Sequence, residues 1–172
     1  MTVTTPSLRE KREQLVREHM ETENRHEFDA TLDTFKHPRY ELVPNDEVID
    51  GATDVAHYYE ETRAAFPDQR NELIKLHHAE DSVIAEFDLL GTHNGPYRGL
   101  PPTGRSFRCR MVAIFEFEGD GLVCERVYFD SATILRQLGI AHDPLTLRGR
   151  LATVANHPVT IGRALVRGLV GR

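Results

Sequence analysis

Two residues suited to acid–base chemistry stand at the ends of predicted strands. Asp130 follows an alternating run at 122–129 and precedes a helix-like run, and His93 ends an alternating run that begins at residue 82. A carboxylate at the mouth of an apolar cavity would have its pKa raised by desolvation, which suits it to remove and return a proton next to a carbonyl. His93 shares strand parity with Phe87 and Leu89, so we expect it on the buried side, where it could orient Asp130 or bond a substrate oxygen.

Both residues also have structural interpretations. An aspartate between a strand and a helix is a good N-cap, because its oxygen can accept from the amide of Ala132 or Thr133. Ser131 could cap the helix instead and leave Asp130 free. His93 could hold the Gly/Pro-rich turn that follows it by bonding the backbone there. The residue pattern leaves these alternatives open.

The elements that position these residues fall into two groups. Periodicity and capping signals predict helices over 8–26, 27–35 and 51–66, with short strands at 40–44 and 48–49. From residue 72 onward the apolar period is two, which predicts strands at 72–78, 82–93, 107–118 and 122–129, and a closing helix at 131–138. Helices first and an antiparallel meander afterwards indicate the α+β class.

Three stretches carry a family resemblance: Thr92-His93-Asn94-Gly95, Pro101-Pro102-Thr103-Gly104-Arg105, and YFDSATILRQLG at 128–139. Together they resemble the SnoaL-like polyketide cyclase branch of the nuclear transport factor 2-like superfamily, over residues 7–140. The resemblance implies a cone-like curved antiparallel sheet that wraps N-terminal helices around one pocket. It also implies that Asp130 handles protons during an aldol-type ring closure and that the protein is a homodimer.

Other residues are expected around this pocket. We predict Asp130 and His93 as catalytic residues, and as substrate-binding residues Tyr128, Glu116, Tyr58, Phe87 and Met111. No metal site is expected, because the adjacent His77 and His78 would point to opposite faces of a strand. The glycines lack phosphate-loop spacing, and the predicted enzyme uses no cofactor. Its predicted ligand is a hydrophobic, carbonyl-containing, polycyclic or ring-forming small molecule, and its reaction is a proton transfer of the cyclase or isomerase type.

Two other functions compete with this one. An epoxide hydrolase of the limonene-epoxide type would require Asp88, Arg110 or Arg126, and Asp130 to meet around a water molecule. A non-catalytic binding or assembly module is expected if side chains fill the cavity and Asp130 only caps the helix. The same fold is reused for binding alone, so enzyme status does not follow from it.

Charge and composition limit the partners. The net charge of −6 argues against a nucleic-acid partner. The N-terminus has no apolar signal-peptide core and no segment approaches a membrane span, so we expect a cytoplasmic protein. We divide the chain into a domain at 1–140 and a basic amphipathic helical tail at 141–172, which holds five arginines and one aspartate. The tail could pack on the acidic body, residues 1–140, of this or a partner subunit. Alternatively, it could make weak contact with an anionic membrane surface.

Overall fold

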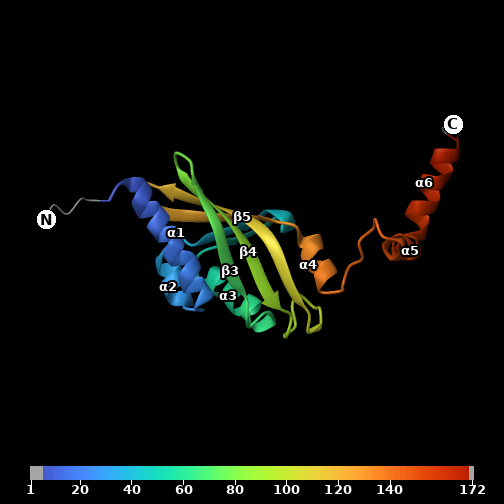
Figure 1. Ribbon diagram of the computed structural model, residues 1–172, viewed down its shortest axis with the longest axis horizontal. Helices are drawn as coiled ribbons and strands as arrows, with labels where there is room; N and C mark the ends of the chain where they lie inside the picture. Colours follow the sequence, from blue (N-terminus) through green and yellow to red (C-terminus); the bar gives the residue numbers. More distant parts are fainter. Residues whose placement is uncertain (1–5, 171–172) are drawn as a thin grey trace.

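The computed structural model describes residues 6–170 and shows a six-stranded curved sheet with helices on its concave side (Figure 1). In chain order the elements are α1 (Leu8–Asn24), α2 (Phe28–Asp33), β1 (Arg39–Leu42), η1 (Val43–Asn45), β2 (Glu47–Asp50), α3 (Ala52–Ala65), β3 (Arg70–His78), β4 (Ser82–Thr92), β5 (Ser106–Glu118), β6 (Gly121–Phe129), α4 (Ser131–Gln137), α5 (Leu147–Asn156) and α6 (Pro158–Val170). The predicted α+β fold is confirmed, with element ends displaced by only a few residues.

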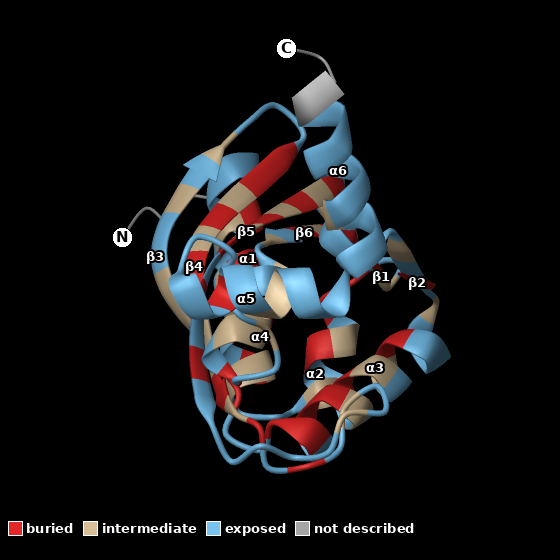
Figure 2. Ribbon diagram, turned by 90° about the vertical axis from the view of Figure 1, so that its right-hand side faces the viewer, coloured by how far each residue is buried: buried red, intermediate tan, exposed pale blue. Residues whose placement is uncertain are grey.

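The sheet has the strand order β2-β1-β6-β5-β4-β3. β3 to β6 form an antiparallel meander, whereas β1 runs parallel to β6, so the sheet is mixed rather than wholly antiparallel. The concave side of β5 carries the alternating buried residues that the period-two pattern predicted: Phe107, Cys109, Met111, Ala113, Phe115 and Phe117. Figure 2 shows buried segments along β4, β5 and α3, whereas α5 and α6 are largely exposed.

The first helix, α1, has a capped N-terminus and is bound to the turns of the sheet by a buried arginine. Ser7 and Glu10 form the predicted capping box at its N-terminus. Arg12 is buried, and its guanidinium donates to the carbonyl oxygens of Gly119 and Glu80, at 2.6–2.8 Å. Gly119 lies in the turn between β5 and β6, and Glu80 lies between β3 and β4. One arginine therefore binds α1 to the two neighbouring hairpin turns.

A β-bulge decides which face of β6 points inward. Glu116 pairs with Cys124 and Phe117 pairs with Leu122, which leaves Val123 as an extra residue on β6. The side-chain alternation therefore changes phase at this point. Downstream of the bulge the residues opposite the inward positions of β5 are Glu125, Val127 and Phe129.

The tail, which contains α5 and α6, extends away from the body of the protein, residues 6–140, at the end where α4 lies (Figure 1). α5 begins after its N-cap, Thr146, whose hydroxyl accepts a hydrogen bond from the amide of Gly149. The helix ends at its C-cap, His157, and α6 begins at Pro158. The predicted helical tail is thus confirmed and consists of two helices, while the division into domains at residue 140 stays a prediction. Within residues 6–170, no helix is both long and apolar enough to cross a bilayer.

Candidate functional site

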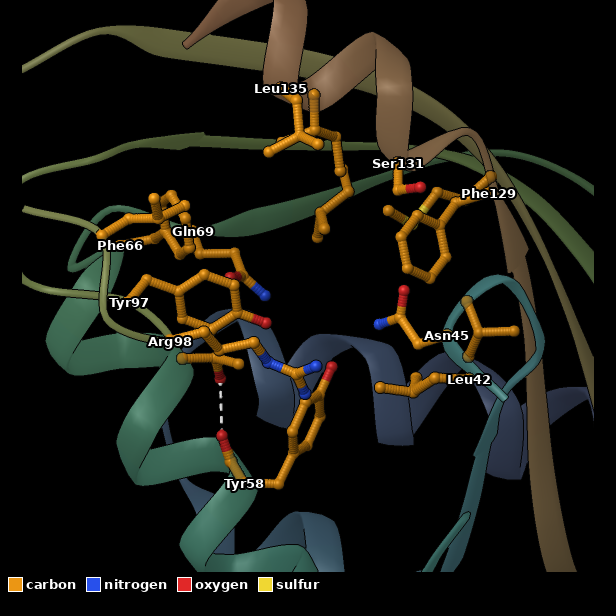
Figure 3. A pocket seen from close by; sticks show the side chains of 16 residues that line it. Leu42, Asn45, Tyr58, Phe66, Gln69, Tyr97, Arg98, Phe129, Ser131 and Leu135 are labelled. Carbon is orange, nitrogen blue, oxygen red and sulfur yellow. Dashed lines mark hydrogen bonds between the residues drawn. The ribbon is translucent and has the colours of Figure 1, made fainter. Parts of the chain in front are cut away.

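A cavity of about 320 Å³ lies between the concave face of the sheet, α3, α4 and the loop that follows β4 (Figure 3). Its walls are mainly apolar. The lining residues are Leu42, Asn45, Tyr58, Thr62, Phe66, Gln69, Leu89, Tyr97, Arg98, Leu100, Met111, Val127, Phe129, Ser131, Ile134 and Leu135. This volume and this lining are typical of a site for a small hydrophobic molecule.

The polar groups of the cavity are hydroxyls, amides and one guanidinium. Figure 3 shows the amides of Asn45 and Gln69 directed into the cavity from opposite sides. Burial raises the pKa of Tyr58 and of Tyr97, so both phenols stay protonated near neutral pH and can donate a hydrogen bond. Arg98 donates to Glu47 at 2.6 Å and lies over the Tyr97 ring, with its guanidinium carbon 5.4 Å from the ring centre. The cavity therefore offers hydrogen-bond donors among mainly apolar walls.

A tight turn at residues 97–100 brings three of these residues to the wall. Tyr97 and Leu100 exchange both backbone hydrogen bonds, at 3.0 and 2.9 Å. The two residues between them, Arg98 and Gly99, have φ of 48° and 80°, as expected for a type I′ turn. The sequence signal for it is the glycine after Arg98. The residues expected from the sequence do not include this turn or its two polar wall residues, Tyr97 and Arg98.

The loop that carries the turn is held on the end of α3. The amides of Asn94 and Gly95 both donate to the carbonyl of Ala65 at 3.0 Å. A Cβ on Gly95 would lie 2.1 Å from the carbonyl oxygen of Ala64, so only glycine fits there. The glycine of the Thr92–Gly95 motif thus serves a close backbone contact that positions Tyr97.

A buried polar cluster lies next to the cavity residue Tyr58, whose ring centre is 5.8 Å from that of Tyr40. His19 Nε2 lies 3.0 Å from the Tyr40 hydroxyl and 3.1 Å from Glu125 Oε2. The Tyr40 hydroxyl is also 2.8 Å from that of Tyr59. His19 and Tyr59 are fully buried and Glu125 is 5% exposed. Burial raises the pKa of Glu125, and this is opposed by its contact with His19.

Asp130 lies beside the cavity but its side chain caps α4. Its carboxylate accepts from the amide of Ala132 at 3.0 Å and from the hydroxyl of Thr133 at 2.5 Å, and pairs with Arg136 at 3.3 Å. The hydrogen bond from Thr133 lowers the pKa of this exposed carboxyl. The expected desolvation and raised pKa are therefore wrong. The next residue, Ser131, is the one that lines the cavity, and a catalytic role for Asp130 stays a prediction.

His93 is fully buried, as its strand parity predicted, and it holds the following loop. Its Nδ1 accepts from the amide of Thr103 at 3.3 Å and lies 3.3 Å from the Thr103 hydroxyl. Its ring is stacked at a tilt on Phe66, which lines the cavity. Among the described residues, no hydrogen bond joins His93 to Asp130, and its buried Nε2 has no partner. The turn-holding interpretation thus describes its observed contacts.

Three of the five predicted substrate-binding residues lie on the concave side of the sheet, and two lie on its outer face. Tyr58 and Met111 line the cavity. Phe87 is buried in the core on the same side of the sheet but is not part of the lining. Tyr128 and Glu116 are corrections: Tyr128 is 43% exposed opposite Val112, and Glu116 accepts from Arg126 at 2.7 Å. Both lie on the outer face: Glu116 because the buried positions of β5 are the odd-numbered ones, and Tyr128 because the bulge in β6 turns the even-numbered residues after it outward.

The three groups needed for an epoxide hydrolase do not meet. Asp88 accepts from Arg110 at 2.6 Å and from Arg108 at 2.8 Å on the outer face of the sheet. Arg126 is engaged by Glu41 and Glu116 there as well. Within the part of the chain that the structure describes, neither arginine contacts Asp130 in an ion pair. The geometry gives no support to this alternative.

Within the described residues, no group of three histidine, cysteine or acidic side chains is arranged to hold a metal ion. Glu125, His19 and most of the lining residues are likewise absent from the residues expected from the sequence. An acid inside the run VCERVYF is a signal for an unusual residue, but the run does not show which way that acid points.

Solved structures with this fold span several described functions. A candidate SnoaL-like polyketide cyclase from Jannaschia sp. has a TM-score of 0.71 at 15% identity, with 83% of this chain and 100% of that chain covered. AclR, a candidate hydroxylase from Streptomyces galilaeus, has a TM-score of 0.68 at 22% identity, with 80% and 89% covered. A Catenulispora acidiphila protein with a ketosteroid isomerase-like fold has a TM-score of 0.64 at 17% identity, with 80% and 95% covered.

These likenesses establish the fold. Among curated proteins, no sequence matches this chain. The family described as SnoaL-like polyketide cyclase matches residues 13–138, which include the whole sheet and all of the cavity lining. The chain belongs to the SnoaL-like polyketide cyclase family.

Proposed function

We propose that this protein binds a hydrophobic, carbonyl-containing small molecule in the cavity and catalyses a proton transfer of the cyclase or isomerase type without a cofactor. The observation that carries the proposal is the mainly apolar cavity with phenol donors in its wall. Family membership supports the same class of reaction. A polycyclic or ring-forming ketone fits the lining, because its rings would contact the apolar side chains.

The donors of the wall would act on the carbonyl oxygen. Removal of a proton from the carbon next to a carbonyl leaves an enolate, whose negative charge lies mainly on that oxygen. Protonated Tyr58 and Tyr97 can donate to it, and Arg98 adds a positive charge nearby. Such donors stabilise the enolate more strongly in a cavity that excludes water. For isomerisation the proton returns to another carbon of the same molecule, so no second reactant is consumed.

We propose Asp130 as the base that removes the proton. Asp130 precedes the lining residue Ser131, and its low pKa keeps it ionised and able to accept a proton. To act, its side chain must leave the cap of α4 and turn toward the cavity. His93 would support this site through Phe66 and the loop rather than by direct contact with Asp130.

A binding module without catalysis is the second candidate. It is favoured by one observation: the sixteen lining residues include no carboxylate and no imidazole. A binding module would retain its ligand unchanged and would not depend on Asp130. The predicted homodimer is compatible with either function and stays a prediction.

Binding should depend on the Tyr58 hydroxyl. A panel of bicyclic and tricyclic aromatic ketones is tested by thermal shift and then by calorimetry. Tyr58→Phe removes one hydrogen bond of about 0.5–1.5 kcal/mol and should weaken the binding of a selected ketone by roughly 2- to 13-fold. Tyr128→Phe is the matched control, because Tyr128 is on the outer face. Equal affinities for the two variants would contradict the assignment of the cavity.

Turnover should distinguish the enzyme from the binding module. With a β,γ-unsaturated cyclic ketone, or a ketone selected by binding, Asp130→Asn should lower kcat by about 10²–10⁴-fold if Asp130 is the base. Asparagine is as good an N-cap as aspartate, so the melting temperature should stay unchanged. Asp130→Ala, which loses the cap, should lower the melting temperature as well. Unchanged turnover in Asp130→Asn would exclude Asp130 as the base, and binding without turnover in the wild type would favour the module.

A further inference from the structure

The tail formed by α5 and α6 carries apolar side chains and arginines that the rest of the described chain leaves uncovered. Its large exposed hydrophobic residues are Leu145, Leu147, Leu151, Val154, Val159, Leu165 and Val166, each at least half exposed. More than half of the large exposed hydrophobics of the described chain lie in this short segment. Isolated apolar residues on a surface are ordinary, but a continuous series on two successive helices indicates a surface that binds something.

The polar residues of the tail are arranged around this apolar surface. In α6, Arg163 and Arg167 share one sector of the helix with Thr160, and apolar or small residues occupy the remainder. In α5, Leu147, Leu151 and Val154 share a face, as residues spaced by three and four do. From residue 144 to residue 170 the sequence contains four arginines and no acidic residue.

The body does not use this surface. Figure 1 shows α5 and α6 standing clear of the sheet and its helices. Within residues 6–170, no ion pair engages Arg148, Arg150, Arg163 or Arg167, and no hydrogen bond joins α5 or α6 to the body. The cationic and apolar groups of the tail are therefore both available.

We propose that α5 and α6 bind the surface of a membrane that contains anionic lipids. A helix with a wide apolar arc and a narrow cationic sector lies in the plane of the interface, with its apolar side among the acyl chains and its arginines at the headgroups. Anionic headgroups are the partner that this charge fits, since each arginine near such a surface adds to the attraction. The acidic body would remain on the aqueous side, and α4, which lines the cavity, would lie close to the lipid. The proposal is independent of the reaction proposed above.

Vesicle co-sedimentation of the full chain tests this proposal. The chain should sediment with vesicles of equal parts phosphatidylcholine and phosphatidylglycerol and remain in solution with phosphatidylcholine alone. Arg163→Glu/Arg167→Glu should reduce binding to the mixed vesicles by at least about tenfold, as should Leu165→Ser/Val166→Ser. The matched control is Lys11→Glu/Lys75→Glu, which changes the net charge equally on exposed positions of the body and should bind like the wild type.

Other outcomes would overturn the proposal. Absence of binding to the mixed vesicles would do so, and so would equal loss of binding in the tail variant and the body control. Sedimentation velocity without lipid tests whether the tail binds a second copy of the chain. A dimer that the tail substitutions dissociate would show that the tail covers a second copy of the chain instead. Melting temperature should be unchanged in both tail variants, because no hydrogen bond or ion pair joins the tail to the body within residues 6–170.

Discussion

Replacement of His19 by leucine should lower the free energy of unfolding by about 3–5 kcal/mol, because it leaves the buried carboxyl of Glu125 without the imidazole that lies 3.1 Å from its Oε2. The substitution also removes the hydrogen bond between Nδ1 and the Thr34 hydroxyl, at 2.8 Å. Urea denaturation near neutral pH measures the loss. A cost below about 1 kcal/mol would contradict the importance of the pair.

Two further variants distinguish the cost of the unpartnered Glu125 carboxyl from the cost of the lost packing of His19. His37 is an exposed histidine paired with Asp50, so His37→Leu should change stability by less than about 0.5 kcal/mol. His19→Leu/Glu125→Gln should recover part of the stability lost in His19→Leu, because an amide has no charge to bury. If the double variant is no more stable than the single one, the loss is due to packing.

The same pair predicts a pH dependence. Burial raises the pKa of Glu125 above its unfolded value, so the folded state holds this proton more tightly than the unfolded state. Stability from this source is present below about pH 4.3 and is lost as pH rises through the folded pKa. The destabilisation by His19→Leu should therefore be largest near neutral pH and smaller in acid.

Gly95→Ala should have the second large effect, on both stability and ligand binding. The new Cβ would lie 2.1 Å from the backbone oxygen of Ala64, a contact that only a shift of the loop relieves. Overpacking of this kind costs about 1–3 kcal/mol and occasionally more. Because Tyr97 and Arg98 follow in the same loop, their displacement should also weaken binding of the ketone selected by thermal shift.

The control for this substitution is Gly162→Ala in α6, where a Cβ meets no atom within 4 Å. Alanine is the better helix former by about 1 kcal/mol, so this variant should be as stable as the wild type or slightly more stable. Melting temperature and calorimetry of both variants measure the two effects. Unchanged ketone binding in Gly95→Ala would show that the loop does not form part of the site.

Local signals in the sequence determined the elements and the class of fold. The Ser7–Glu10 capping box begins α1 as predicted, and the alternation from Phe107 to Phe117 predicts the buried face of β5. These predictions succeed because helix caps and strand alternation depend on neighbouring residues alone. The motifs at 92–95 and 128–139 also indicated the family to which the chain belongs.

Only the tertiary structure decided which residues line the cavity. Counting alternate residues from buried Leu122 places Tyr128 and Asp130 inside, yet the bulge at Val123 reverses the faces and turns Glu125, Val127 and Phe129 inward. The close contact of Gly95 with Ala64 likewise joins residues about thirty positions apart in the chain. Strand register and loop docking depend on the partner strand and on the helix that the loop contacts, and neither is present in the local pattern of residues.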